Sequence, residues 1–160
     1  MGKVSEELLI PAPLADVWDL YFERRSWPSW VDQLRTVESV EGGYPEVGGK
    51  LVWKSGPAGR GRVTETVLEH EHRRLHKIRF EDESSEGEQT TTFRMEGTGT
   101  MVKLDLAYGL LQAGPLGPIT DRLFIRSQMR RMLQRSLMGL RAEAGGDAGG
   151  GNTLSDLLPG

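Results

Sequence analysis

The feature that most constrains this chain is a run of short β-like segments followed by one long helical segment. Six segments between residues 36 and 108 are rich in residues typical of strands, and turns rich in glycine, proline or serine separate them. Because successive strands with short connections pair antiparallel, the run predicts an antiparallel meander. The expected strands are residues 36–41, 50–55, 61–70, 74–81, 89–96 and 100–108.

A single long helix is expected after the last of these strands. Pro115 and Pro118 suit the beginning of a helix and the pair Gly145-Gly146 suits its end, which predicts a helix over about residues 116–143. At 1.5 Å per residue this helix would be roughly 40 Å long, enough to cross a whole sheet. An antiparallel sheet must bury one face, and this helix is the largest element that could cover it.

The residues before the meander complete an α+β fold. A strand is expected at residues 4–10, a helix at 14–22 and a second short helix at 26–34. The whole would be a curved antiparallel sheet of about seven strands with two short helices and one long C-terminal helix. We expect one domain over residues 1–144 and a flexible glycine-rich tail over residues 145–160.

Composition excludes several classes of protein. The 160 residues contain no cysteine, which excludes a disulfide scaffold, a zinc knuckle and a thiol nucleophile. No apolar run approaches the roughly 20 residues that a membrane span needs, and acidic residues stand where a signal peptide would be apolar, so we expect a cytoplasmic protein without an integral membrane segment. A net charge of −3 argues against nucleic-acid binding. The sequence leaves the oligomeric state open.

Nucleotide-cofactor motifs are missing as well. The glycine-rich residues 56–61 lack the third glycine of a dinucleotide-binding loop, and they lead into an expected strand instead of a helix. No G-x-S-x-G nucleophile motif occurs. We therefore expect no cofactor.

The order of elements and three short motifs carry a resemblance to a known superfamily. Residues 11–18 (PAPLADVW) enter the first helix, residues 27–30 (WPSW) open the second, and residues 97–100 (GTGT) lie in the last hairpin. With the closing helix, this pattern resembles the SRPBCC superfamily, the helix-grip group that includes START lipid-transfer domains, Bet v 1-like proteins and polyketide cyclases/dehydrases. The resemblance covers about residues 4–143. It implies a deep pocket for a hydrophobic small molecule, without implying one reaction.

Alternation along the strands and helical spacing along residues 116–143 predict the walls of such a pocket. The clearest strand has Val102, Leu104, Leu106 and Tyr108 on one face and polar residues on the other. The expected lining residues are Trp53, Val63, Ile78, Phe80, Phe93, Leu104, Leu106, Tyr108, Leu123 and Met129.

Three ionisable residues are candidate catalytic groups. His76 shares a strand face with Ile78 and Phe80, where it is either a hydrogen-bonded core residue or a general base. Glu65 either lies among apolar groups, with a perturbed pKa, or faces solvent. Arg126 falls near the apolar arc of the long helix, where it either reaches solvent or holds an oxygen of the ligand.

A metal site is not expected. His70 and His72 share a strand face, but no third ligand follows at a recognisable spacing, and the segment is typical of a solvated hairpin turn.

Three functions remain from the sequence. The first is binding of a hydrophobic small molecule (polyketide-like, lipid-like or aromatic) between the sheet and the C-terminal helix. The second is a cyclase or dehydratase that moves protons through His76, Glu65 or Arg126. The third is docking of the basic helix, which carries six arginines and only two acids over residues 116–144, onto an acidic protein or an anionic membrane through Arg131, Arg135 and Arg141.

Overall fold

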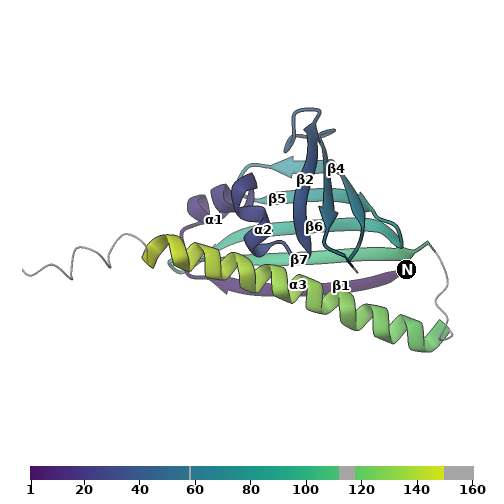
Figure 1. Ribbon diagram of the computed structural model, residues 1–160. Coiled ribbons are helices and arrows are strands. Elements are labelled where there is room, and N and C mark those ends of the chain that lie inside the picture. The colour runs from purple at the N-terminus through teal and green to yellow at the C-terminus, as the bar shows by residue number, and fades with distance from the viewer. Residues whose placement is uncertain (58, 112–117, 150–160) are drawn as a thin grey trace, which may run out of the picture.

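A computed structural model describes residues 1–57, 59–111 and 118–149 (Figure 1). The order of elements is that expected of a helix-grip fold, with one strand, short helices, a meander and a long helix. The bounds are β1 Gly2–Ile10, α1 Leu14–Tyr21, a 3-10 turn Arg24–Ser26, α2 Trp27–Trp30, β2 Leu34–Glu41, β3 Lys50–Ser55, β4 Arg62–Glu71, β5 Leu75–Glu81, β6 Ser85–Glu96, β7 Gly99–Leu110 and α3 Pro118–Gly149.

The seven strands form one antiparallel sheet, which confirms the predicted α+β fold. Their order is β1-β7-β6-β5-β4-β3-β2, so the meander is continuous from β2 to β7 and the N-terminal strand adds to its far edge. Register shifts interrupt the pairing of β2 with β3 and of β4 with β5. Such bulges bend a strand and increase its twist. Figure 1 shows the result, with β2 to β4 running across the direction of β1 and β7.

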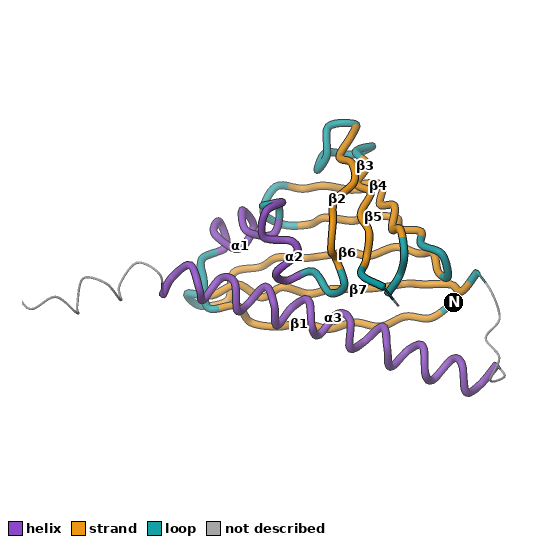
Figure 2. Tube along the Cα trace, viewed as in Figure 1, coloured by secondary structure: helices purple, strands orange, loops and turns teal. Residues whose placement is uncertain are grey.

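The three helices cover one face of this curved sheet. In Figure 2, α3 runs along β1, and α1 and α2 lie between its C-terminal part and the strands β5 and β6. The core lies between these helices and the sheet, where α3 contributes Leu133, Leu137 and Leu140. This is the inner face that the alternation in β7 predicts, since Leu104 and Leu106 are buried there.

The end of α2 and the beginning of β6 differ from the prediction. The second helix ends at Trp30, where residue 34 was expected, because Val31 is already extended and the chain turns into β2. Strand β6 begins at Ser85, four residues before the expected start. There the carboxylate of Asp82 accepts hydrogen bonds from the backbone amides of Ser84 and Ser85, which makes the β5–β6 turn tighter than its glycine- and serine-rich composition indicates.

The long helix also continues past its expected end. It begins at Pro118 and reaches Gly149, because Gly145 does not adopt the left-handed conformation that ends many helices. The residues 116–117 of the expected helix and residues 150–160 of the expected tail lie outside the described residues.

A close approach between α2 and α3 depends on Gly139. A Cβ atom at this position would lie 2.9 Å from both the Cα and the carbonyl oxygen of Trp30. Since both atoms belong to the backbone, neither could move without displacing α2. The absence of a side chain at residue 139 therefore sets the distance between the two helices.

We expect Gly139→Ala to destabilise the protein although alanine favours helix formation. The added methyl group should cost about 1–3 kcal/mol of unfolding free energy by forcing α2 and α3 apart. Gly145→Ala is the matched control, because nothing lies within 4 Å of its added Cβ atom. This control should stabilise the helix by up to about 1 kcal/mol. Urea unfolding followed by tryptophan fluorescence measures both, and equal effects of the two variants would contradict the packing argument.

Candidate functional site

A cavity of about 90 Å³ lies between the sheet, α2 and α3. Its walls come from the inner faces of β3 to β7 and from the C-terminal half of α3. Most lining residues are apolar or aromatic, and a few polar side chains project among them. The lining residues are Tyr21, Trp27, Trp30, Val31, Asp32, Leu34, Tyr44, Leu51, Trp53, Arg60, Glu65, His76, Ile78, Phe80, Gln89, Leu104, Leu106, Met132, Leu133, Ser136, Leu137 and Leu140.

Half of the pocket walls expected from the sequence line this cavity. They are Trp53, Ile78, Phe80, Leu104 and Leu106. Three others are buried in the surrounding core without lining it, namely Val63, Phe93 and Tyr108. Phe93, for example, packs edge-on against the ring of Trp18.

The last two expected pocket walls, Leu123 and Met129, and the candidate catalytic residue Arg126 all lie on α3, and none of them lines the cavity. Leu123 is 66% exposed and Arg126 is exposed, and neither lines the cavity. Met129 is half-buried and lines an outer groove instead. The helical periodicity is intact, but the N-terminal part of α3 diverges from β1, as Figure 1 shows, so its inward face has no sheet opposite it.

Arg60, which lies in the glycine-rich segment 56–61, provides a cation that lines the cavity. Its guanidinium lies over the rings of Trp53 and Phe80, at 5.5 and 5.1 Å from their centroids. Its Nε donates to the Oδ2 of Asp82 over 2.8 Å, and its Nη1 contacts the sulfur of Met132 at 3.8 Å. Arg60 also lines the outer groove, so it forms the boundary between the cavity and that groove.

The carboxylate of Asp82 anchors this arginine. The side chain is buried and accepts hydrogen bonds from Ser84, Ser85 and Arg60. Burial alone would raise the pKa of Asp82, but the Arg60 charge and these hydrogen bonds together hold it below its usual range. The ion pair therefore stays charged and keeps the guanidinium in place.

Glu65 lies on the inner face of β4, which resolves the alternative that the sequence left open. The side chain lines the cavity, and the indole Nε1 of Trp53 donates to its Oε2 over 2.6 Å. Burial raises the pKa of the Glu65 carboxyl, although the hydrogen bond from Trp53 and the charge of Arg60 oppose the shift. The site thus holds a carboxyl that retains its proton to higher pH than an exposed glutamate.

Two tyrosines face the same part of the cavity. The hydroxyl of Tyr21 hydrogen-bonds to Thr91 over 2.8 Å. Burial, together with the charge of Glu65, raises the pKa of both Tyr21 and Tyr44, so both phenols are protonated and can serve as hydrogen-bond donors.

His76 is buried and lines the cavity, as its position beside Ile78 and Phe80 indicated. Its Nδ1 lies 3.0 Å from the Nδ1 of His70. Its Nε2 is sealed from solvent and has no hydrogen-bond partner among the described residues. Burial, with the neighbouring His70, lowers the pKa of His76 to about 3, so the ring is neutral at physiological pH.

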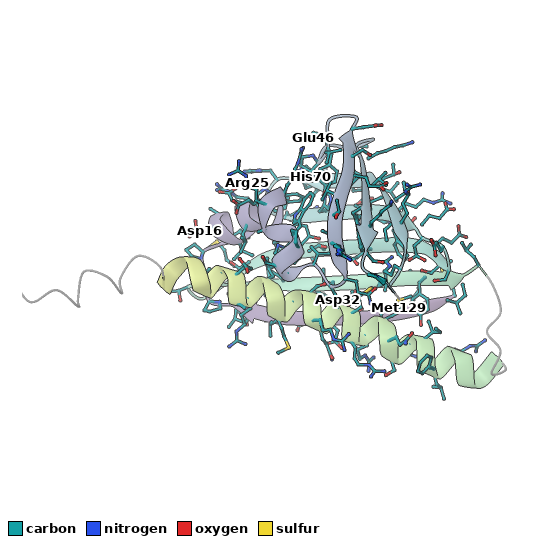
Figure 3. All side chains as sticks on the ribbon, in the orientation of Figure 1. Asp16, Arg25, Asp32, Glu46, His70 and Met129 are labelled. Atoms are coloured by element: carbon teal, nitrogen blue, oxygen red, sulfur yellow. The ribbon has the colours of Figure 1, made fainter. Side chains whose placement is uncertain are left out.

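A bulge in β4 brings His70 to this position. The register shifts between Val67 and Glu69, so the inward face passes from Val67 to His70, which then lies opposite His76 in β5. The expectation of a solvated His70 is therefore wrong, since the side chain is half-buried and packs against Trp18 and Phe22. Figure 3 shows His70 close to Glu46, below the loop between β2 and β3 at the top of the view.

Asp32 supplies a further acid, at the end of α2 near α3. Its backbone amide donates to the hydroxyl of Ser136 over 2.9 Å, and its Oδ2 is buried without a partner in the part of the chain that the structure describes. Burial raises its pKa, while the charges of Arg135 and Arg60 oppose the shift. Figure 3 places Asp32 beside α3, near Met129.

Over residues 1–57, 59–111 and 118–149, no group of three or more histidine, cysteine, aspartate or glutamate side chains is placed to hold a metal ion. No helix within these ranges combines the length and the apolar composition that crossing a membrane requires.

Three polar residues line the cavity although the sequence did not predict them there, namely Arg60, Asp32 and Tyr44. Arg60 lies between two glycines in a segment typical of a turn, and Asp32 follows a short helix. Tyr44 lies in the loop between β2 and β3. None belongs to a periodic pattern, so only the path of the chain brings these residues to the cavity.

We expect the low pKa of His76 to make the fold sensitive to mild acid. In the unfolded chain this pKa is near 6.5, and in the folded chain it is about 3. Between these values the unfolded chain binds a proton that the folded chain does not, so stability falls as the pH is lowered from 6.5. His76→Gln should flatten this dependence between about pH 6.5 and 4.5, and the exposed His72→Gln should retain it. Urea titrations at a series of pH values measure the slope, and a slope unchanged in His76→Gln would contradict the assignment.

Comparison with known proteins places these features in a family. A sequence model of the family described as polyketide cyclase / dehydrase and lipid transport matches residues 1–145. The chain is 25% identical to TTHA0849 from Thermus thermophilus, with a TM-score of 0.71 over 91% of this chain and 99% of that one. It is 17% identical to the ZhuI aromatase/cyclase from Streptomyces sp. R1128, with a TM-score of 0.74 over 90% and 93% of the two chains.

A START superfamily protein from Mycobacterium smegmatis has the same fold, with 12% identity and a TM-score of 0.71 over 89% of this chain and 97% of that one. A search of curated proteins gives no match. The matches confirm the resemblance that the sequence motifs indicated. The chain belongs to the polyketide cyclase / dehydrase and lipid transport family and has the helix-grip fold.

Proposed function

We propose that this protein binds a small, largely apolar molecule in the cavity between the sheet and α3. The observation that carries the proposal is a cavity with mostly apolar walls, lined also by two polar groups that lack partners among the described residues. Such a combination is typical of small-molecule sites, where apolar walls supply affinity and a few polar groups fix the orientation of the ligand. Membership of the family supports the same role. A cytoplasmic location stays a prediction.

The size of the cavity favours a small ring over a long chain. Sites for drug-sized ligands measure about 300–1,000 Å³, and an apolar cavity of about 150 Å³ admits benzene. The present cavity, at about 90 Å³, is smaller than either. Among aromatic, polyketide-like and lipid-like ligands, a single ring requires the least enlargement of the cavity, and the other two require it to open further.

An opening of this kind would lie at the boundary between the cavity and the outer groove. Arg60, Met132 and Asp32 line both spaces, so their side chains lie between the two. The contact from Arg60 to the Met132 sulfur is long, and methionine is the most adaptable apolar side chain. Movement of these two side chains would join the cavity to the groove without breaking the sheet.

We expect Leu137→Phe to weaken binding of cyclohexanone, a small apolar ring with one carbonyl. The larger side chain occupies cavity volume, so affinity should fall by about tenfold or more, which corresponds to about 1.4 kcal/mol. Leu123→Phe is the matched control on the same helix, because its side chain is exposed. Chemical-shift titration measures both affinities, and urea unfolding checks that Leu137→Phe is folded. Equal affinities of the two variants would place the ligand elsewhere, and no binding to the unmodified protein would refute the proposal for rings of this size.

Acid–base catalysis of the cyclase or dehydratase type is the alternative function. The observation that favours it is the Glu65 carboxyl, whose raised pKa suits proton donation to a carbonyl oxygen, in a cavity that the neutral His76 also lines. Enolisation of a ketone needs such a donor at the oxygen and a base at the adjacent carbon. Arg60 replaces the exposed Arg126 as the cation available to a developing enolate.

The exchange of the α-hydrogens of cyclohexanone for deuterium tests this alternative. The protein should accelerate exchange above the rate in buffer, and Glu65→Gln should reduce that acceleration by about a hundredfold, because the amide keeps the shape of the side chain but cannot donate an acidic proton. Glu69→Gln, at an exposed position of the same strand, should have no effect. NMR follows the exchange, and identical rates in the two variants would remove Glu65 from the chemistry.

Docking through Arg131, Arg135 and Arg141 remains a prediction from the sequence. All three side chains are exposed on α3. A solvated helix face accounts for this exposure equally well, so the structure adds no observation in its favour.

A further inference from the structure

The two histidines that face each other across β4 and β5 connect the cavity to the surface. His76 is 3% exposed and lines the cavity, whereas His70 is half-buried and lies near Glu46. Their Nδ1 atoms are 3.0 Å apart, and their rings are nearly perpendicular. The bulge after Val67 is what turns His70 toward its partner. Bulges often re-aim a side chain in this way beside a functional site.

A contact between two Nδ1 atoms requires that one of them carries a hydrogen and the other does not. If His70 were the donor, neutral His76 would carry its hydrogen on Nε2, where it would be a buried N–H group without an acceptor among the described residues. Among buried backbone groups, an N–H without an acceptor is rarer than an acceptor that lacks a donor, and we take the same preference for the imidazole ring. His76 is therefore the donor through Nδ1, and its Nε2 presents a lone pair to the interior.

We propose that His76 and His70 form a two-histidine proton relay from the cavity to solvent, a role that rests on the acid–base function proposed above. The Nε2 of His76 takes a proton from an acidic C–H or O–H group of the ligand. At the same time the Nδ1–H bond of His76 breaks and its proton forms the Nδ1–H bond of His70. The ligand is left as an anion, and His76 is neutral with its hydrogen on Nε2. His70 carries the positive charge until its own Nε2–H bond breaks and that proton passes to water.

The relay overcomes the weakness of His76 as a base. Burial holds the pKa of His76 at about 3, so an imidazolium at this position is strongly disfavoured. In the relay the positive charge never remains there, because it moves to a half-exposed ring. Desolvation, together with His72, lowers the pKa of His70, although the charge of Glu46 opposes the shift. This burial is smaller than that of His76, because the His70 side chain is only half-buried.

Aromatic side chains pack against both histidine rings and hold them in position. Trp18 and Phe22 pack against the ring of His70, at centroid distances of 5.2 and 5.4 Å, and Phe22 also lies edge-on to His76 at 4.9 Å. Tyr44 completes the enclosure of His76 at 5.8 Å. These contacts restrict the rotation of both rings, so the hydrogen bond between them is preorganised.

Nitrogen-15 NMR of the ligand-free protein tests the direction of the hydrogen bond. The chain contains only three histidines, so each ring can be assigned through single substitutions. At neutral pH we expect the hydrogen of His76 on Nδ1 and that of His70 on Nε2. The opposite tautomers, with the hydrogen of His76 on Nε2, would overturn the relay whether or not a ligand is ever found.

Deuterium exchange of bound cyclohexanone tests the function of the pair. His70→Phe keeps an aromatic ring at this position but cannot accept a proton, so it should slow exchange by about tenfold or more without changing the affinity for cyclohexanone. His72→Phe, in the same hairpin but exposed, should exchange at the unmodified rate. An equal rate in His70→Phe and in the unmodified protein would overturn the relay alone. Binding without accelerated exchange would overturn both the relay and the acid–base function, and failure to bind would overturn the binding proposal and leave the tautomers to decide the relay.

Discussion

The contact between Gly139 of α3 and Trp30 of α2 sets the distance between these two helices. Because the two backbones meet with no side chain between them, this part of α3 is held close to α2. The sheet meanwhile bends away through the bulges in β2 and β4. Close packing at one end and curvature at the other leave a volume that the side chains of Leu133 and Leu137 line without filling.

The polar groups in this volume distinguish it from an ordinary packing defect and support the proposed binding role. A void in an apolar core is usually lined by apolar atoms alone, and a buried polar group usually has a partner. Here the Nε2 of His76 and the Oδ2 of Asp32 lack partners among the described residues, and burial favours the protonated form of Glu65. Each of these groups reduces the stability of the fold and improves the recognition of a polar ligand group, a combination common at functional sites.

The sequence predicts those parts of the site that follow a regular period. Alternation in β5 placed His76, Ile78 and Phe80 on the inner face, where the structure has them. Two kinds of residue escaped this reasoning. His70 escaped because one extra residue in β4 shifts the period, and nothing in the sequence marks the shift. Arg60 escaped because it lies in a turn, where the direction of a side chain depends on the path of the chain and not on a pattern.

The same limit explains the error on α3. Helical spacing correctly identifies the arc of the helix that contains Leu133, Leu137 and Leu140, but an arc is buried only where another surface lies opposite it. Leu123 belongs to the same arc and is exposed, because the curved sheet does not extend beneath the beginning of α3. The extent of a cavity therefore depends on the curvature of the sheet, and in this protein part of that curvature comes from the same bulge that brings His70 to His76. The curvature around the cavity and the proposed histidine relay thus share a dependence on one irregularity in β4.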